Sequence, residues 1–401
     1  MLKSKNEDKF VFTEINIVDS ETTRLSLTYW QDAWRRLKKN KLSMFGIFMI
    51  FLIICFGVIG PFFTSYSYSD QINKYKNLPP FLQLYKLDDT YLYLSKDYNM
   101  FQVAEDGQLI DRLELDKKRR DVINKIYYYK LGEEDIKLDF SYNTLPTKQG
   151  YDYDFTIEYK GKTVTSAEAW DKKLNKEFPF GTDELGRDLL TRVMYGARIS
   201  LLIALIATIV VLCIGVIYGS ISGYTGGRAD EIMMRLVDII NSVPLVLYVI
   251  LLMVWFRDGG LNNIILALGS VYWVQMARLV RGQMLALKEQ EYILAARVMG
   301  VSKLRIIFKH LIPNAMGPII VSTAMMIPAA IFTEAFLGFI GLGVSAPQAS
   351  WGTLANSALP GLTSYPYQLF FPALAIAITM LALNFIGDGL RDALDPRLRK
   401  G

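Results

Sequence analysis

One stretch of the chain reads Glu291-Tyr-Ile-Leu-Ala-Ala-Arg-Val-Met-Gly300-Val-Ser-Lys-Leu-Arg-Ile-Ile-Phe-Lys-His310-Leu-Ile-Pro313, and hydrophobic runs flank it on both sides. Apolar residues at positions i, i+3, i+4 and i+7 predict one face of a helix, and they are Tyr292, Ala295, Ala296 and Met299. Gly300 is expected to interrupt this helix, because glycine adopts a positive φ without strain in the turn after a helix.

A second short helix is predicted after the glycine. Ser302 is a suitable N-cap for it. Its apolar residues repeat the helical spacing, and they are Leu304, Ile307, Phe308 and Leu311. Arg305 and Lys309 lie one turn apart on another face, and Pro313 suits the first turn of the helix that follows. The pattern alone favours two interpretations equally: a helix pair that lies on lipid headgroups, or a loop that docks into a partner at the membrane surface.

The residue types favour docking. Ala295-Ala296, Gly300 and Pro313 resemble the coupling-loop signature of binding-protein-dependent ABC importer permeases, which reads Glu-Ala-Ala, three residues, Gly, nine residues, Ile, one residue, Leu-Pro. The sequence differs from that signature at Leu294, His310 and Ile312. The resemblance implies that the cytoplasmic loop at 281–312 inserts into a groove on an ATP-hydrolysing subunit. The residues expected to serve this coupling are Tyr292, Ala295, Ala296, Gly300, Ser302, Arg305, His310 and Pro313.

Composition places the chain among membrane proteins with a substantial aqueous part. It has 401 residues, 52% of them hydrophobic, and a positive mean hydropathy of +0.23. Its two cysteines, Cys55 and Cys213, both lie in apolar runs, so the sequence indicates neither a disulfide framework nor a metal site. The formal net charge of +5 is less informative than the positions of the charges.

The N-terminal segment, residues 1–41, is predicted to be cytoplasmic. Residues 1–20 are polar and unpatterned, without the apolar core and cleavage site of a signal peptide. Residues 25–41 are amphipathic and basic, and their aromatic residues Trp30 and Trp34 predict a helix at the membrane surface. A nucleic-acid role is disfavoured, because no folded reader or stacking platform accompanies the charge.

Six hydrophobic segments are long enough to cross a membrane, at residues 42–63, 199–221, 232–256, 261–280, 313–340 and 370–387. The first alone would rise about 33 Å as a helix, against roughly 30 Å for a hydrocarbon core. Lys and Arg are frequent at 278–309 and absent from 341–371, so both termini and the 281–312 loop are expected in the cytoplasm. The sequence therefore predicts an all-α polytopic membrane protein.

Residues 64–178 are a different kind of sequence, rich in Lys, Asp, Glu and Tyr and without a membrane-spanning run. Alternation at 151–159 predicts a strand followed by a turn, whereas 111–131 and 163–175 are expected to be helices. We therefore expect a small α+β domain outside the membrane, inserted between the first and second spans. A structural or docking module is favoured over an enzyme, because this region has no His or Cys cluster and no nucleophile motif.

Further motifs resemble the dipeptide and oligopeptide branch of the same permeases. They are Gly181-Thr-Asp-Glu-Leu-Gly-Arg-Asp188 with Tyr195-Gly-Ala-Arg-Ile-Ser200, Gly341-Leu-Gly-Val-Ser-Ala-Pro-Gln-Ala-Ser-Trp-Gly352, and Asn384-Phe-Ile-Gly-Asp-Gly-Leu-Arg-Asp-Ala-Leu-Asp-Pro-Arg-Leu398. Taken alone, the first of these loops could hold a cation, whereas its carboxylates would repel phosphate. The resemblance covers residues 25–63 and 179–400, the second range being the expected permease core, and leaves the 64–178 insertion outside.

Two carboxylates fall inside predicted spans. Asp238 is expected either to face a water-filled path or pair with a basic residue, or to reach the cytoplasmic surface from near the end of its helix. Glu334 is expected to face the bundle interior, where it would touch the substrate path or simply join helices. A ridge of small residues at intervals of four predicts close helix packing, and it consists of Gly215, Gly219 and Gly223.

The family resemblance implies a function as well as a fold. Such a chain would be a type I ABC importer permease of the bacterial cytoplasmic (inner) membrane, forming half of a pathway that a second, different permease chain completes. Substrate would arrive on an external substrate-binding protein. Resemblance to this branch implies that the transported substrate is a short peptide, with nickel or another small solute as the alternative. The sequence has no Gly-x-x-x-x-Gly-Lys-[Ser/Thr] phosphate loop, so ATP and Mg²⁺ are expected on cytoplasmic ATP-binding subunits and the chain itself is not expected to be an enzyme.

The rival interpretation is a membrane receptor or scaffold that uses residues 64–178, and it would not need the 281–312 loop. A membrane-embedded enzyme would need a paired acid–base or metal constellation, and the spans offer only the isolated Asp238 and Glu334. The single histidine, His310, makes no metal site by itself.

Overall fold

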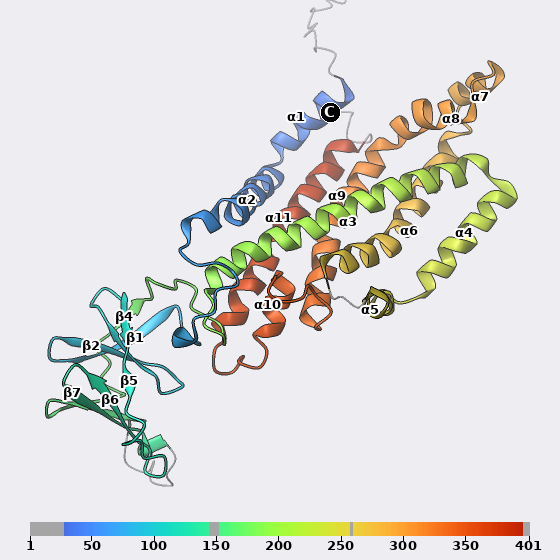
Figure 1. Ribbon diagram of the computed structural model, residues 1–401. Coiled ribbons are helices and arrows are strands. Elements are labelled where there is room, and N and C mark those ends of the chain that lie inside the picture. The colour runs from blue at the N-terminus through green and yellow to red at the C-terminus, as the bar shows by residue number, and fades with distance from the viewer. Residues whose placement is uncertain (1–27, 144–151, 257–259, 396–401) are drawn as a thin grey trace, which may run out of the picture.

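The computed structural model describes residues 28–143, 152–256 and 260–395. It places a bundle of long helices at one end of the molecule and a β-structure at the other (Figure 1). The predicted unpatterned segment 1–20 and the last residues of the C-terminal motif lie outside the described residues.

The bundle is built from the apolar segments of the sequence. In chain order its helices are α1 (Tyr29–Lys39), α2 (Lys41–Val58), α3 (Leu189–Thr225), α4 (Gly227–Ser242), α5 (Leu245–Phe256), α6 (Leu261–Leu287), α7 (Glu291–Val298), α8 (Lys303–Arg305), α9 (Ile312–Phe339), α10 (Trp351–Ser357) and α11 (Tyr367–Leu394). A π-helix at Ile306–Leu311 joins α8 to α9, so that residues 303–339 run as one helix.

Within the described residues, five helices are long and apolar enough to cross a membrane, and a bent pair brings the number to six if it counts as one span. The five are Lys41–Val58, Leu189–Thr225, Leu261–Leu287, Lys303–Phe339 and Tyr367–Leu394. Each of them overlaps one of the predicted spans.

The predicted third span, 232–256, is broken into two helices. α4 and α5 are bent by 81° relative to each other. Between them Val243 is extended, with φ −88° and ψ 125°, and Pro244 follows. Proline disfavours the helical conformation in the residue before it and has no backbone N–H to donate, so the break falls where the sequence requires one.

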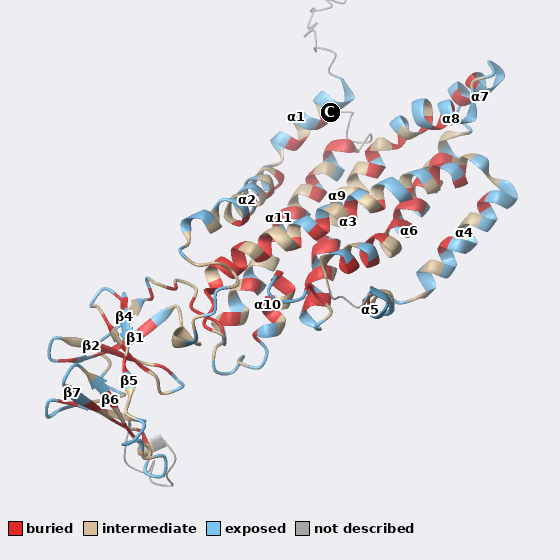
Figure 2. Cartoon of the chain, in the orientation of Figure 1, coloured by how far each residue is buried: buried red, intermediate tan, exposed pale blue. Residues whose placement is uncertain are grey.

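The 37-residue helix α3 is the central element of the bundle. It packs along α6 and also contacts α2 and α9, while α11 packs against α2 and α9. Buried residues line the facing sides of α3, α6 and α9, whereas α4 and α5 are largely exposed (Figure 2). At 1.5 Å per residue α3 is about 55 Å long, well beyond the roughly 30 Å of a hydrocarbon core.

The inserted region forms two antiparallel sheets of five strands each. The first has the order β10 (Asp171–Leu174), β1 (Phe81–Leu87), β2 (Thr90–Leu94), β3 (Met100–Val103) and β4 (Leu109–Arg112). The second has the order β5 (Glu114–Leu115), β6 (Ile126–Leu131), β7 (Glu134–Asp139), β8 (Thr156–Tyr159) and β9 (Lys162–Thr165). Because the last strand pairs with the first, the chain enters and leaves this region at the same place.

The two helices predicted in this region are wrong. Residues 111–131 hold the end of β4 together with β5 and β6, and residues 163–175 hold β9 and β10. The density of charge at 111–121 suggested a helix, but the following residues alternate, with Tyr127 and Tyr129 buried. Aromatic residues on a half-buried pleated surface favour a strand. β8 lies within the predicted strand 151–159, and its turn to β9 uses Lys160 and Gly161 at positive φ.

Candidate functional site

The loop singled out in the sequence lies at the end of the bundle away from the strands (Figure 1). α7 ends at Val298, and Gly300 then adopts a φ of +78°. Ser302 occupies the N-cap position of α8, although its side chain makes no capping hydrogen bond. Pro313 falls in the first turn of α9, as its backbone chemistry favours.

The loop has two faces of opposite character. Its inner face joins the buried core of α3, α4, α6 and α9, and it consists of Ile293, Ala296, Ile306, Ile307 and Leu311. Its outer face carries large exposed apolar side chains, of which Val298 is 88% and Met299 75% exposed; the others are Tyr292, Leu294, Leu304 and Phe308. Basic residues lie among them, namely Arg297, Lys303, Arg305 and Lys309. We call this second set the outer face of the loop.

The predicted apolar face is divided differently in the structure. Ala296 points inward, whereas Tyr292, Ala295 and Met299 are exposed. Both sides of α7 are apolar, so helical spacing alone could not tell which of them faces the core. The same ambiguity holds after the glycine, because residues of the predicted stripe at 304–311 are shared between the two faces.

His310 lies in the π-helix, partly exposed, and its backbone carbonyl accepts a hydrogen bond from Asn314 Nδ2 at 2.6 Å. Arg305 is exposed at the end of α8. The residues described here and elsewhere in the structure contain no group of three or more His, Cys, Asp and Glu side chains placed to hold a metal ion.

Polar contacts tie the loop to the end of α3. The guanidinium of Arg297 lies over the ring of Tyr224, 5.2 Å from its centroid. Lys288 Nζ donates to the carbonyl of Gly223 at 3.1 Å. Tyr224 and Gly223 belong to the last turn of α3, so the loop and the central helix are held together at this point.

A carboxylate that the sequence analysis missed reinforces this region. Asp230, in the first turn of α4, accepts two hydrogen bonds from Arg281 of α6, at 2.6 Å from Nε and 2.7 Å from Nη2. Ser222 of α3 also donates to it. The pair is a two-pronged guanidinium–carboxylate contact between elements 51 residues apart, so no local spacing in the sequence could indicate it.

The two carboxylates that the sequence did indicate lie in separate places. Asp238 pairs with Arg278 at 2.8 Å, and both side chains are exposed. Glu334 is fully buried, and its Oε2 accepts a hydrogen bond from Ser200 Oγ at 2.8 Å. The structure therefore does not bring them together into one polar centre.

The three glycines of the predicted ridge lie along the contact between α3 and α6. A Cβ at Gly215 would meet Met276, and one at Gly219 would meet Ala277. A Cβ at Gly223 would meet the backbone of Arg281. Only a residue without a side chain lets the two helix backbones approach this closely.

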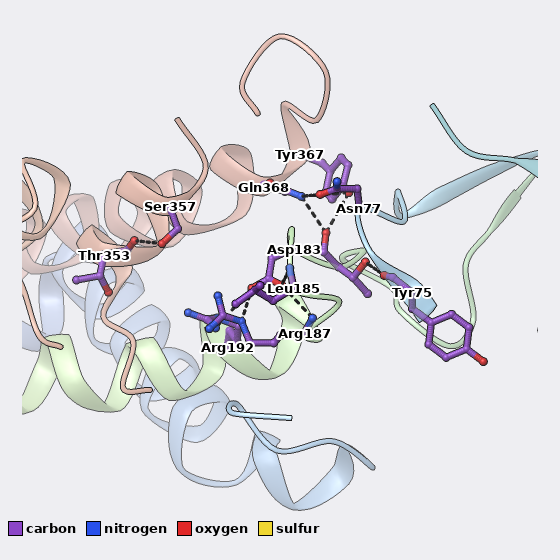
Figure 3. Close-up of polar contacts among 11 residues, drawn as sticks. Tyr75, Asn77, Asp183, Leu185, Arg187, Arg192, Thr353, Ser357, Tyr367 and Gln368 are labelled. Carbon is purple, nitrogen blue, oxygen red and sulfur yellow. Dashed lines mark hydrogen bonds and ion pairs between the residues drawn. The ribbon is translucent and has the colours of Figure 1, made fainter. Parts of the chain in front are cut away.

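The motif at 181–188 joins the bundle to the inserted sheets (Figure 3). Asp183 Oδ1 accepts hydrogen bonds from the backbone N–H groups of Leu185 and Arg187, each at 2.9 Å, and its Oδ2 accepts from Arg187 Nε at 2.6 Å. Asp188 caps α3 by accepting from the N–H groups of Leu190 and Thr191. These carboxylates are committed to internal partners, so the loop is a structural joint and not a cation cradle.

Thr182 is the link between this joint and the two neighbouring segments. Its Oγ1 donates to the Tyr75 carbonyl at 2.5 Å and accepts from the Leu78 N–H at 2.9 Å. Its own carbonyl accepts from Gln368 Nε2 and from the Tyr367 hydroxyl, both at 3.0 Å. The start of the inserted region and the start of α11 are thus fastened to one residue, which the sequence placed in a motif without showing its role.

Comparison with known proteins gives consistent matches. A family model described as "Binding-protein-dependent transport system inner membrane component" matches residues 215–400, and one described as "N-terminal TM domain of oligopeptide transport permease C" matches residues 28–80. The chain is 40% identical to the oligopeptide transport system permease protein OppC of Bacillus subtilis (strain 168), over 96% of this chain and 95% of that protein. It is 41% identical to the dipeptide transport system permease protein DppC of the same organism, over 94% and 88% respectively.

The relative from Escherichia coli (strain K12), also an oligopeptide transport system permease protein OppC, is 48% identical but aligns over only 55% of this chain. The two Bacillus subtilis alignments extend across the 64–178 insertion. The insertion therefore lies within the similarity to some relatives, which corrects the expectation that it stands outside.

Proposed function

The chain belongs to the oligopeptide and dipeptide permease family of binding-protein-dependent transport systems, and from this membership we propose that it forms one half of a transmembrane pathway for short peptides. A second, different permease chain supplies the other half, and an external binding protein delivers the peptide. Cytoplasmic subunits bind ATP and Mg²⁺ and drive the pathway between its outward-open and inward-open states.

The observation that carries this proposal is the outer face of the loop. Val298 and Met299 are exposed on a loop whose inner face belongs to the core of the bundle. Exposed apolar side chains gathered in one place mark an interaction surface, and here basic residues surround them. A protein bound to the outer face would therefore push directly on α3, α6 and α9, which is what coupling ATP hydrolysis to transport requires.

The proposal is tested by purifying the whole complex through a tag on this chain. We expect the double variant Val298→Asp, Met299→Asp to lose the ATPase subunits while the second permease still co-purifies. Both residues are exposed, so the bundle is expected to fold normally. Ile123→Asp is the matched control, because Ile123 is 91% exposed but lies in the inserted region. Retention of the ATPase by the double variant would refute the coupling role of the loop.

The membrane topology is part of the proposal. It counts α4 and α5 as one span, which gives six, and places both termini on the cytoplasmic side. Two observations support it: the Tyr29 hydroxyl of α1 donates to the Leu394 carbonyl of α11 at 3.3 Å, and both helix ends lie toward the α7–α8 end of the bundle (Figure 1). The inserted sheets are then external, where a binding protein delivers its cargo.

The proposed substrate is tested by uptake of radiolabelled tetraalanine into proteoliposomes that hold the complete complex with ATP inside. ATP-dependent uptake that needs the external binding protein is the expected result. Uptake of neither tetraalanine nor any other short peptide by an assembled, ATP-hydrolysing complex would contradict the peptide assignment.

A further inference from the structure

The inserted region holds an open cleft of about 740 Å³ that the permease function does not explain. This volume lies in the range typical of small-ligand sites. One wall is the first sheet, and the other is the segment that leads into β8 together with the turn after β9. Its aromatic and charged lining residues are Phe81, Tyr85, Tyr93, Tyr98, Phe155, Lys96, Lys172, Asp152 and Asp154.

β1 supplies the floor of the cleft. Phe81, Gln83 and Tyr85 alternate along the strand and all three line the cleft. Lys172 of β10 lies opposite Gln83 in the sheet register, and its Nζ stands over the ring of Phe81 at 5.5 Å from the centroid. Among the described residues no carboxylate pairs with Lys172, so this cation is available at the Phe81 end.

Tyr85 marks the other end. Only 4% of this residue is exposed, and its ring meets the ring of Phe155 edge-on at 5.4 Å. Burial, together with the nearby carboxylate of Asp154, raises the pKa of the Tyr85 hydroxyl to about 12, so it remains a neutral donor. Within the described part of the chain no protein group forms a hydrogen bond with this hydroxyl, although it lines the cleft. The hydroxyl is therefore free to donate a hydrogen bond to a ligand in the cleft that it lines.

The two ends of the cleft carry opposite charge. Asp154 lies near Tyr85 and its charge acts on the hydroxyl, and Asp152, two residues earlier in the chain, lines the same cleft. Lys172 lies beside Phe81. Tyr85 is four positions along β1 from Phe81, which is about 13 Å at the rise of a strand. An extended tetrapeptide with free ends separates its amine and its carboxylate by roughly the same distance, since it has the same rise per residue.

We infer that this cleft binds a short peptide in extended form, with its terminal amine at Asp152 and its terminal carboxylate at Lys172. Aromatic side chains along the floor accept side chains of any composition, and the two charges fix length and direction. The inference rests on the proposed function, because it takes the transported peptide as the ligand.

The cleft lies next to the external end of the bundle. Lys96, on its rim, donates to the Ser364 carbonyl at 2.7 Å, and neighbouring Asp97 accepts from the Tyr365 hydroxyl at 2.9 Å. Both partners belong to the connection between α10 and α11. A peptide bound in the cleft would therefore lie at the entrance of the proposed pathway, between the binding protein and the membrane.

The test is equilibrium dialysis of radiolabelled tetraalanine against the full-length chain in detergent. We expect saturable binding that falls about tenfold or more in Lys172→Gln and in Asp152→Asn. Lys130→Gln is the matched control, because Lys130 is exposed on β6 and does not line the cleft. Dialanine, which is too short to reach both charges, is expected to bind at least tenfold more weakly than tetraalanine.

Peptides with one blocked end test which charged residue contacts which end of the peptide. N-acetyl-tetraalanine should bind the Asp152→Asn variant and the unsubstituted chain equally, and tetraalanine amide should do the same for Lys172→Gln. Equal binding of tetraalanine to the unsubstituted chain and both variants would overturn the inference. The inference would also be overturned if the isolated chain did not bind tetraalanine although the complete complex transported it. The proposed transport function would then stand, and only the peptide-binding role of the cleft would be wrong. If the chain bound tetraalanine but the complete complex did not transport it, peptide binding by the cleft would be supported and the proposed peptide transport would be contradicted.

Discussion

At the scale of single residues, Glu334 is a fully buried carboxyl whose contacts connect three helices. The Trp351 backbone N–H donates to Ser200 Oγ at 3.3 Å, and that hydroxyl donates to Glu334 Oε2 at 2.8 Å. Trp351 also donates its indole N–H to the Val193 carbonyl at 3.0 Å. These contacts join α10, α3 and α9 around one side chain, so Glu334 fastens the segment 341–357 to the bundle.

Two substitutions of Glu334 distinguish how its shape and how its charge contribute to the stability of the protein. Glu334→Gln keeps an acceptor for Ser200 and is expected to reduce the free energy of unfolding less than Glu334→Leu does. Glu334→Leu leaves the Ser200 hydroxyl buried without an acceptor and should cost about 1–3 kcal/mol. Thermal unfolding in detergent measures both. If the Gln variant is as unstable as the Leu variant, a negative charge is required at this position.

The contact between Asp230 and Arg281 gives a second prediction at this scale. Arg281→Lys retains the charge but not the two parallel hydrogen bonds, and we expect it to lose about 1 kcal/mol or more of stability. Arg281→Ala leaves Asp230 with Ser222 alone and should lose about 1.5–3 kcal/mol, the range for hydrogen bonds to a charged group. Arg278→Ala is the control, because its pair with Asp238 is exposed and such pairs contribute about 0–1 kcal/mol. Equal losses at Arg278 and Arg281 would contradict this ranking.

The sequence predicts the position of a residue correctly where the free-energy cost of an uncompensated charge in the membrane determines it. An uncompensated charge at membrane depth is unfavourable, and Glu334 is indeed in the bundle interior. The same reasoning selected Asp238 and passed over Asp230, because Asp230 stands in a polar segment near a helix end. Its importance comes from Arg281, a partner far along the chain, and only the packing of α3, α4 and α6 brings the two together.

At the scale of elements, the turn at Gly300 sets the path of the backbone between α7 and α8 in the 281–312 loop. Its φ of +78° is the left-handed region, and no atom lies within 4 Å of the place where a Cβ would stand. Any effect of a substitution there is therefore a backbone effect without a steric clash.

Gly300→Ala is expected to destabilise the loop by about 1–2 kcal/mol, since a Cβ disfavours the left-handed conformation. Gly282→Ala is the matched comparison: Gly282 also has open space around its Cβ but lies inside α6. There alanine should stabilise by about 0.5–1 kcal/mol, because it favours the helix. Hydrogen exchange of the loop amides reports the first effect and thermal unfolding the second. A stabilising Gly300→Ala would show that the turn does not need positive φ.

Element prediction was most reliable for long apolar runs and least reliable in the inserted region. Each of the five long apolar helices overlaps a predicted span, because only a helix satisfies the backbone of so long an apolar segment in a membrane. The predicted span at 232–256 is divided at Pro244, a residue whose backbone chemistry already favours a break. At 111–131 the density of charge predicts a helix, but the tyrosines at 127–129 favour a strand, and the strand forms.

At the scale of the whole molecule, the joint at 181–188 holds the inserted sheets to the bundle. Thr182 is fully buried and binds both neighbouring segments. Sequence comparison could recognise the motif, but the partners of Thr182 lie more than 100 residues away in either direction, at Leu78 and Gln368.

Thr182→Val keeps the shape of the side chain and removes its hydroxyl. The Leu78 N–H and the Tyr75 carbonyl then lose their partner, at a cost of about 1–3 kcal/mol for each group that stays unsatisfied. We expect faster hydrogen exchange at residues 71–80 and unchanged exchange in α6. Thr163→Val, on the exposed strand β9, is the control. Unaltered exchange at 71–80 would mean that the other contacts suffice to hold the joint.

The length of α3 has a mechanical consequence. One end of this helix is capped by Asp188 in the joint, and the other end carries Tyr224 beneath Arg297 of the loop. No proline interrupts its 37 residues. A displacement along its axis at the loop end is therefore transmitted to the joint, and to the sheets that the joint holds, through one continuous helix. In the proposed topology, peptide would therefore act at one end of α3 and nucleotide at the other, so both would load the same helix.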